Sequence, residues 1–225
     1  MGQAIGDILP FAVVVAISPI PIIAMVLVLA TPRARANGPA FALGWIAGLS
    51  VLGAIVLVLT TGNAADDSGG PATWVSGLKL VFGVVFLVLA VRTWLGRPKA
   101  GQEAEMPKWM GTVDAFTAGR SLGAGVVLSA FNPKNLVLTV TAGLTIAEAG
   151  ISDGQEVVAL AVFVLIASLG VLALLGIHLV MGERAAPLLD GLKAWLAAHN
   201  AAIMTVLLLV LGAKLIGDAI RGFAA

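Results

Sequence analysis

Long apolar segments separated by short polar ones dominate the pattern of hydrophobic and polar positions along this chain. A helix needs roughly 20 predominantly apolar residues to cross the hydrocarbon core of a bilayer, and six segments meet that length. They are Ile5–Ala30, Gly38–Thr61, Thr73–Gly96, Arg120–Thr145, Glu156–Met181 and Ala201–Phe223. The pattern therefore predicts an all-α integral membrane protein with six transmembrane helices, folded as a single membrane domain over residues 1–225.

Proline interrupts two of these segments near their middle. The first contains Ser18-Pro19-Ile20-Pro21 and the fourth contains Asn132-Pro133-Lys134-Asn135. Proline lacks a backbone N–H and clashes with the carbonyl four residues earlier, so we expect both helices to be broken there. In a bilayer, irregular backbone is tolerated only where protein or a water-filled cavity covers it. Interrupted segments at corresponding points of two chain halves are typical of a transporter's substrate site.

The two halves also match each other weakly. Pro133 lies 114 positions after Pro19, and a second set of matches has an offset of 129. In that set Leu80, Gly83, Ala90 and Arg92 fall on Leu209, Gly212, Ala219 and Arg221. The larger offset corresponds to an amphipathic connection at about residues 183–199. Three segments in each half, an odd number, predict two inverted three-helix repeats, at about residues 1–106 and 107–225. Chance coincidence of Gly, Ala and Leu is the alternative.

The basic residues are distributed unevenly among the connections. The first, third and fifth connections carry Arg33, Arg35, Arg92, Arg97, Lys99, Lys108, Arg120, Arg184 and Lys193. The second and fourth carry only acidic residues, which are Asp66, Asp67, Glu148, Asp153 and Glu156. Because Lys and Arg are retained on the cytoplasmic side, the distribution predicts that both termini face outward.

Composition excludes several classes of protein. Apolar residues make up 60% of the chain and charged residues 11%, with a mean hydropathy of +1.06, whereas a soluble domain carries about 25% charged residues. The chain has no cysteine and only two histidines, too few for a usual zinc site. It lacks metalloprotease, Walker and nucleophile-elbow motifs. We therefore expect no enzymatic activity, no cofactor, no metal and no nucleic-acid partner.

Lys134 is the strongest candidate for a binding residue. A lysine at the centre of a bilayer costs about 2.5–3.5 kcal/mol on insertion scales, so it should face the protein interior or a cavity. A helix that restarts after Pro133 would present a positive dipole end beside this ammonium, which suits a phosphate, carboxylate or other anionic group. Alternatively, Lys134 only binds carbonyl groups freed by the other break, near Ser18.

The remaining candidates surround the two breaks. Ser18, Pro19 and Pro21 in the first segment, and Asn132, Pro133 and Asn135 in the fourth, either contact the substrate or satisfy the broken backbone. His178, near the end of the fifth segment, is a candidate proton or polar relay, with a packing histidine as the alternative. Lys214 and Asp218 are four residues apart on one helix and are expected to pair. Lys79 is expected to extend towards the membrane surface.

Glycines recur at a spacing of four in two of the segments. The pairs are Gly44/Gly48 and Gly119/Gly123. Small residues at this spacing allow the backbones of neighbouring membrane helices to approach closely. We expect the pairs to mark tight packing within the molecule, with dimerisation as the weaker alternative.

Several motifs resemble a known group of transporters. Ser18-Pro-Ile-Pro21, Gly44-Trp-Ile-Ala-Gly48, Leu78-Lys-Leu and Phe131-Asn-Pro-Lys-Asn135 are similar to motifs of the LysE transporter superfamily, with Ile20 where that pattern has glycine. Pro107-Lys-Trp-Met110, Asp114-Ala-Phe-Thr117, Asn132-Pro-Lys-Asn-Leu136 and Gly212-Ala-Lys-Leu-Ile-Gly217 resemble the GAP, or peptidoglycolipid-addressing protein, family, which includes the sulfolipid-addressing Sap proteins. The resemblance implies a bacterial cytoplasmic-membrane protein that moves glycolipids or other envelope components outward.

Three functional hypotheses follow. The first is an exporter or flippase for an anionic glycolipid, working by alternating access between the two repeats. The second is an exporter of amino-acid-like small solutes. The third is a non-transporting assembly factor for a glycolipid synthesis or export complex. Expected partners are the lipid bilayer and an anionic lipid or small-molecule substrate, with a homodimer or a lipid-synthesis protein as further candidates.

Overall fold

The computed structural model describes residues 1–60, 73–97 and 116–224. Within these ranges every regular element is a helix, which confirms the predicted all-α class. The elements are α1 (Gly2–Ala16), α2 (Pro19–Leu29), α3 (Ala34–Thr60), α4 (Thr73–Leu95), α5 (Ala118–Val126), the π-helix η2 (Val127–Phe131), α6 (Pro133–Ala147), α7 (Asp153–Met181), the 3₁₀-helix η3 (Gly182–Ala185) and α8 (Ala186–Ala224). The predicted repeat boundary at residues 106 and 107 lies outside the described residues, as does most of the motif material at 107–115.

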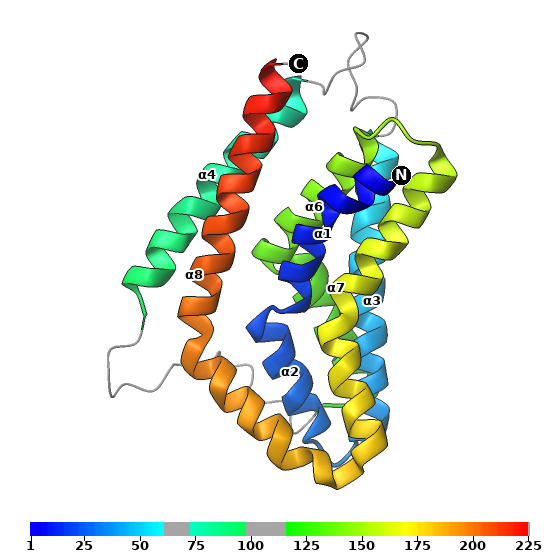
Figure 1. The fold of residues 1–225 in the computed structure, drawn as a ribbon. Helices are drawn as coiled ribbons and strands as arrows, with labels where there is room; N and C mark the ends of the chain where they lie inside the picture. Colours follow the sequence, from blue (N-terminus) through cyan, green and yellow to red (C-terminus); the bar gives the residue numbers. More distant parts are fainter. Residues whose placement is uncertain (61–72, 98–115, 225) are drawn as a thin grey trace.

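The helices form two groups that stand side by side (Figure 1). One group is the antiparallel pair α4 and α8, and the other contains α1, α2, α3, α5, α6 and α7. Both chain termini lie at one end of the molecule, which we call the terminal end. The connections from α2 to α3 and from α7 to α8 lie at the opposite end, which we call the basic end because Arg33, Arg35 and Arg184 lie there.

Both predicted breaks are present. Between α1 and α2 the chain bends by 48°, with Ile17 and Ser18 at the bend. In the fourth segment, α5 gives way to the π-helical turn, and α6 begins after Asn132. Pro19 and Pro133 occupy the first position of α2 and α6, where a helix loses nothing by lacking the N–H. Proline thus both ends one helix and begins the next.

Fewer stretches of the described chain are long and apolar enough to cross a membrane than the six segments predicted from the sequence. By length and apolarity, three stretches of the described chain could cross a membrane, namely α3, α4 and the helical run Asp153–Ala224, and α1 with α2 makes a fourth if counted as one bent span. The amphipathic connection and the last segment share one helix, α8, which is 39 residues long, because no proline lies in it beyond its first turn. Figure 1 shows that this helix changes direction partway along.

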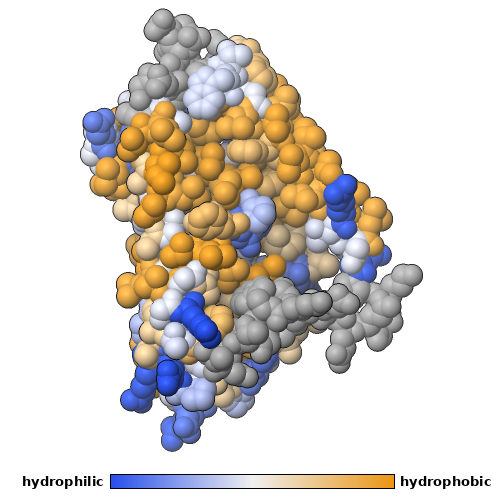
Figure 2. All heavy atoms as spheres, turned by 180° about the vertical axis from the view of Figure 1, so that it is seen from behind, coloured by the Kyte–Doolittle hydropathy of each residue, from blue (hydrophilic) through white to orange (hydrophobic). Residues whose placement is uncertain are grey.

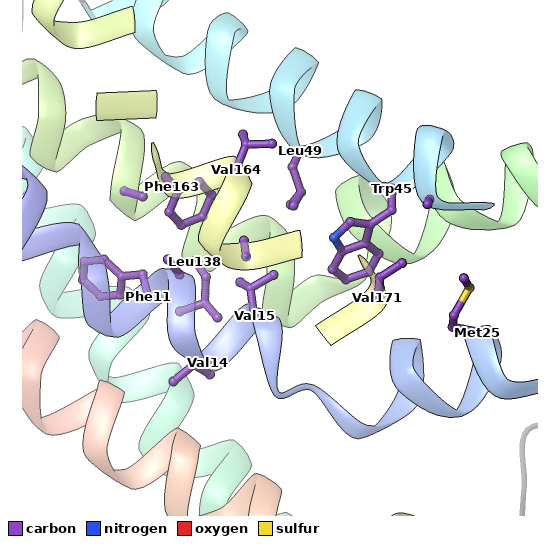
Figure 3. Close-up of a cluster of buried hydrophobic side chains, with 14 of the residues drawn as sticks. Phe11, Val14, Val15, Met25, Trp45, Leu49, Leu138, Phe163, Val164 and Val171 are labelled. Carbon is purple, nitrogen blue, oxygen red and sulfur yellow. The ribbon is translucent and has the colours of Figure 1, made fainter. Parts of the chain in front are cut away.

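The main hydrophobic core lies where the broken helices meet α3 and α7 (Figure 3). Its largest fully buried side chains include Phe11 of α1, Trp45 of α3, Leu138 of α6 and Phe163 of α7. The core therefore packs directly against the bends at Ser18 and Asn132. Ser18 at the first break is buried against this core, whereas Phe131 beside the second break is 69% exposed. The core therefore covers the two breaks only in part.

Apolar side chains also cover much of the outer surface. Figure 2 shows them over the upper and middle part of one face, with hydrophilic side chains gathered mainly at the lower end. Val58 of α3 and Val180 of α7 are 79% and 87% exposed. A soluble monomer rarely exposes contiguous apolar surface larger than a few hundred Å². This surface is consistent with a membrane protein.

Helices α3 and α5 approach each other through Gly44 and Gly125. A Cβ atom at Gly44 would overlap the carbonyl oxygen of Leu122, and one at Gly125 would lie 2.7 Å from the backbone nitrogen of Trp45. A Cβ at Gly48 would likewise overlap Ser129. The expected close packing at Gly44/Gly48 is therefore confirmed.

The same expectation is wrong for Gly119 and Gly123. A Cβ atom at either position would meet nothing within 4 Å. Gly125 carries the contact face of α5 instead, two residues after Gly123 and therefore on a different side of the helix.

Gly44→Ala is expected to lower the free energy of unfolding by roughly 1–3 kcal/mol, because the added methyl forces the α3 and α5 backbones apart. Gly119→Ala is the matched control, since it adds the same methyl to a helix in open space and should be neutral or stabilising. Thermal unfolding in detergent checks the pair. A Gly44→Ala protein as stable as Gly119→Ala would contradict the packing argument.

Candidate translocation site

Lys134 lies in the first turn of α6, and its side chain reaches across to the first broken helix. The residue is only 8% exposed. Its ammonium donates a hydrogen bond to the carbonyl oxygen of Val14 at 3.2 Å and another to the hydroxyl of Ser18. Ser18 in turn donates to the same carbonyl at 2.9 Å. A single buried cation therefore joins the two breaks.

These contacts bear on the two roles left open by the sequence. The carbonyl of Val14 is one that a continuous helix would have paired with the N–H of Ser18, which bonds to Val15 instead. Lys134 thus binds a carbonyl freed by the bend, as the structural alternative requires. An ammonium has three donors, however, and the third forms no hydrogen bond with a described residue. No carboxylate among the described residues pairs with it.

Asn132 and Asn135 both satisfy backbone at the second break. The Asn132 side-chain oxygen accepts from the backbone N–H of Lys134 at 3.1 Å and so caps α6. The Asn135 amide donates to the carbonyl of Leu128 in the π-helical turn at 2.9 Å. The other end of that amide, Oδ1 of Asn135, is buried and has no partner among the described residues. Asn135 therefore keeps one free acceptor beside the break.

Pro19 and Pro21 shape the beginning of α2. Both are buried and, lacking N–H groups, remove two of the donors that a helix start normally offers to an anion. Pro133 does the same at the start of α6, where Asn132 already occupies the N–H of Lys134. The helix ends at the two breaks therefore offer few free N–H donors. The ammonium of Lys134 remains as the main positive group there.

A cavity of about 720 Å³ opens at the basic end, and we call it the basic-end cavity. It lies between the C-terminal parts of α2 and α7, the turn before α3 and the first turns of α8. Half-buried His178 lines it together with Arg33 and Arg35. Lys134 does not line this cavity. The structure thus places the predicted relay residue apart from the two breaks.

A second cavity, of about 480 Å³, opens at the terminal end, and we call it the terminal-end cavity. Its walls carry an ion pair between Lys79 of α4 and Glu148, which directly follows α6. The two side chains are only 8% and 9% exposed. The expectation that Lys79 extends towards the membrane surface is wrong, because it pairs inside the protein. The sequence offered little signal for this pair, whose members are 69 positions apart.

The pairing predicted within α8 is confirmed at the same cavity. The ammonium of Lys214 lies 2.7 Å from a carboxylate oxygen of Asp218. It also lies 4.6 Å from the centre of the Phe11 ring, where a cation–π contact links α8 to α1. No group of three or more metal-ligating side chains gathers within the described residues.

Comparisons with known proteins give one match. Residues 8–221 match the family model described as Sap, sulfolipid-1-addressing protein. A search of curated proteins and a search of solved structures each return no match. The matched range includes both breaks, the basic-end cavity and Lys134, and most of the lining of the terminal-end cavity.

Proposed function

The chain belongs to the family described as Sap, sulfolipid-1-addressing protein, and we propose that it is a membrane transporter for an anionic glycolipid or another envelope component. It would act as an exporter or flippase and move this substrate outward by alternating access. A sulfolipid carries a negatively charged oxyacid group. Charge-assisted hydrogen bonds from an ammonium are a strong way to hold such a group in a site of low polarity.

The observation that carries the proposal is the position of Lys134 between two cavities that it does not line. The basic-end cavity is bounded by α2 and α8, and the terminal-end cavity by α1 and α8. The bend between α1 and α2, where the Lys134 ammonium forms its hydrogen bonds, therefore lies between the two cavities. Alternating access requires that the site never be open to both sides at once, and the packing around Lys134 separates the two cavities.

The packing of the helices supports two inverted repeats of three spans each. Helix α3 packs against α5 and α6, and helix α7 packs against α1 and α2. These two sets of contacts are equivalent if α3 corresponds to α7 and the pair α1 and α2 corresponds to α5 and α6. Gly83 and Gly212, matched at the offset of 129, face each other across α4 and α8. A Cβ on either one would lie 3.0 Å from the carbonyl oxygen of the other. Such reciprocity is expected of residues related by a two-fold axis.

The basic end would face the cytoplasm. Arg33, Arg35 and Arg184 lie there, whereas Glu148 and Asp153 lie at the terminal end. The positive-inside rule then places both termini outside a bacterial cytoplasmic membrane. Substrate would enter from the basic end and leave at the terminal end.

Reconstituted vesicles test the proposal. The protein is incorporated into liposomes that contain a trace of a fluorescent sulfated glycosphingolipid, and a membrane-impermeant reductant then bleaches the outer leaflet. We expect the protein to speed the bleaching of the inner-leaflet fraction, and to do so more for the sulfated lipid than for its unsulfated counterpart.

The same vesicles separate the alternatives. Uptake of a labelled amino acid without any lipid movement would instead support export of small solutes. Movement of neither probe by the isolated protein, together with co-purification of a lipid-synthesis protein, would support an assembly factor. Either result would overturn the proposed lipid transporter.

A further inference from the structure

The basic-end cavity has the size and walls of a ligand site. Its volume of about 720 Å³ falls within the roughly 300–1,000 Å³ of small-molecule pockets. Val26 and Leu29 of α2 and Leu189 of α8 form an apolar wall. Arg33, Arg35 and His178 line the cavity as well, so polar and apolar surfaces meet within it.

The side-chain charges favour an anion. Arg33 and Arg35 form no ion pair with any described residue. Of the two acids on the wall, Asp190 is held by Lys193 at 2.7 Å, and only Glu183 is left without an ion pair within the described chain. Two unpaired cations therefore face one unpaired carboxylate.

Helix dipoles do not change this balance. The C-terminal ends of α2 and α7 line the cavity, and each contributes roughly half a negative charge. The N-terminal ends of α3 and α8 line it too, and each contributes roughly half a positive charge. The four contributions approximately cancel, and the side chains set the sign of the potential.

We propose that the basic-end cavity is the loading site of this protein, where Arg33 and Arg35 bind the sulfate or phosphate ester of a lipid headgroup while the apolar wall accepts the adjoining hydrocarbon. The proposal deepens the proposed function, on which it rests for the identity of the cargo. A lipid fits better than a free oxyanion because Val26, Leu29 and Leu189 offer nothing to an inorganic ion. Basic pockets between helices at the cytoplasmic side are known to bind lipid headgroups.

Binding is measured without transport, with the full chain in nanodiscs of zwitterionic lipid titrated with a fluorescent sulfated glycosphingolipid. We expect the double variant Arg33→Gln/Arg35→Gln to bind roughly 25-fold more weakly, or roughly fivefold for each cation removed near an anionic lipid. Glu183→Gln should bind the lipid more tightly, since it removes the unpaired carboxylate. Binding by the wild-type chain should weaken as the salt concentration rises.

Two control variants test whether the position and the charge of the cavity arginines matter. Arg97 lies just beyond the end of α4, stacks on Trp94 with its guanidinium 4.0 Å from the ring centre, and does not line the cavity. Arg97→Gln should leave binding unchanged, and Arg33→Lys/Arg35→Lys should restore most of it. Inorganic sulfate should compete only at concentrations far above those of the lipid.

Each outcome decides the proposal. Equal binding by Arg33→Gln/Arg35→Gln and the wild-type chain, or an equal loss in Arg97→Gln, would overturn it. Competition by inorganic sulfate at the concentration of the lipid would also overturn it, because the site would then take a free oxyanion. Lipid binding that depends on both arginines but leads to no movement in vesicles would leave the loading site standing and refute the transporter.

Discussion

Lys134→Met is expected to reduce protein-mediated movement of the sulfated lipid to the rate of protein-free vesicles while leaving a folded protein. The variant removes the buried cation that would hold the anionic group between the two cavities. Methionine has a similar volume and fills the space. The carbonyl of Val14 keeps its hydrogen bond from Ser18, so the backbone at the bend stays partly satisfied.

The stability of this variant separates the two roles of Lys134. Loss of its two charge-assisted hydrogen bonds costs about 1.5–3 kcal/mol each, whereas removal of a charge from the membrane interior returns about 2.5–3.5 kcal/mol. Because the two effects largely offset each other, we expect a melting temperature equal to that of the wild type or a few degrees below it. Lys193→Met, which removes a partly exposed lysine from α8, serves as the control. Full transport by Lys134→Met would remove the ammonium from the mechanism and leave it a structural role.

Lys79→Met and Glu148→Gln are each expected to lower the free energy of unfolding by about 3–5 kcal/mol, because each leaves the other charge buried without its partner. The double variant Lys79→Met/Glu148→Gln should recover most of the loss, since a buried ion pair and a neutral replacement of similar volume are often equally stable. Unfolding in detergent across the four proteins gives the coupling energy.

The pair of Lys193 and Asp190 provides the comparison. Its carboxylate side chain is 60% exposed, and solvent screening limits such pairs to well under about 1 kcal/mol. Lys79→Met should therefore destabilise the protein far more than Lys193→Met. If the two variants melt alike, the link between α4 and the end of α6 contributes little to the fold.

The sequence predicted the features that depend on local backbone chemistry. Proline at 19 and 133 ends one helix and begins another whatever surrounds it, so both breaks lie where expected. The pairing of Lys214 with Asp218 depends only on helical spacing. The helical class and the charge difference between the two ends could also be predicted, since apolar length and charge are read directly from the chain.

Features that depend on how distant segments meet could not be predicted. The partner of Lys79 is Glu148, on another helix, and no pattern within either segment indicates which side of α4 faces the core. The contact of Lys134 with Val14 is of the same kind. The choice of Gly125 over Gly123 as the contact glycine depends on the rotation of α5, which three-dimensional packing alone sets.

The shape of α8 has a mechanical consequence. Its 39 residues have a contour length of about 58 Å, nearly twice the roughly 30 Å of a hydrocarbon core, and Figure 1 shows that the helix changes direction partway along. Its first turns line the basic-end cavity and its last turns line the terminal-end cavity. The bend therefore divides a first arm, which lines the basic-end cavity, from a second arm, which carries Asp218 and its ion pairs. A headgroup that docks against the first arm would move the second arm only through this bend.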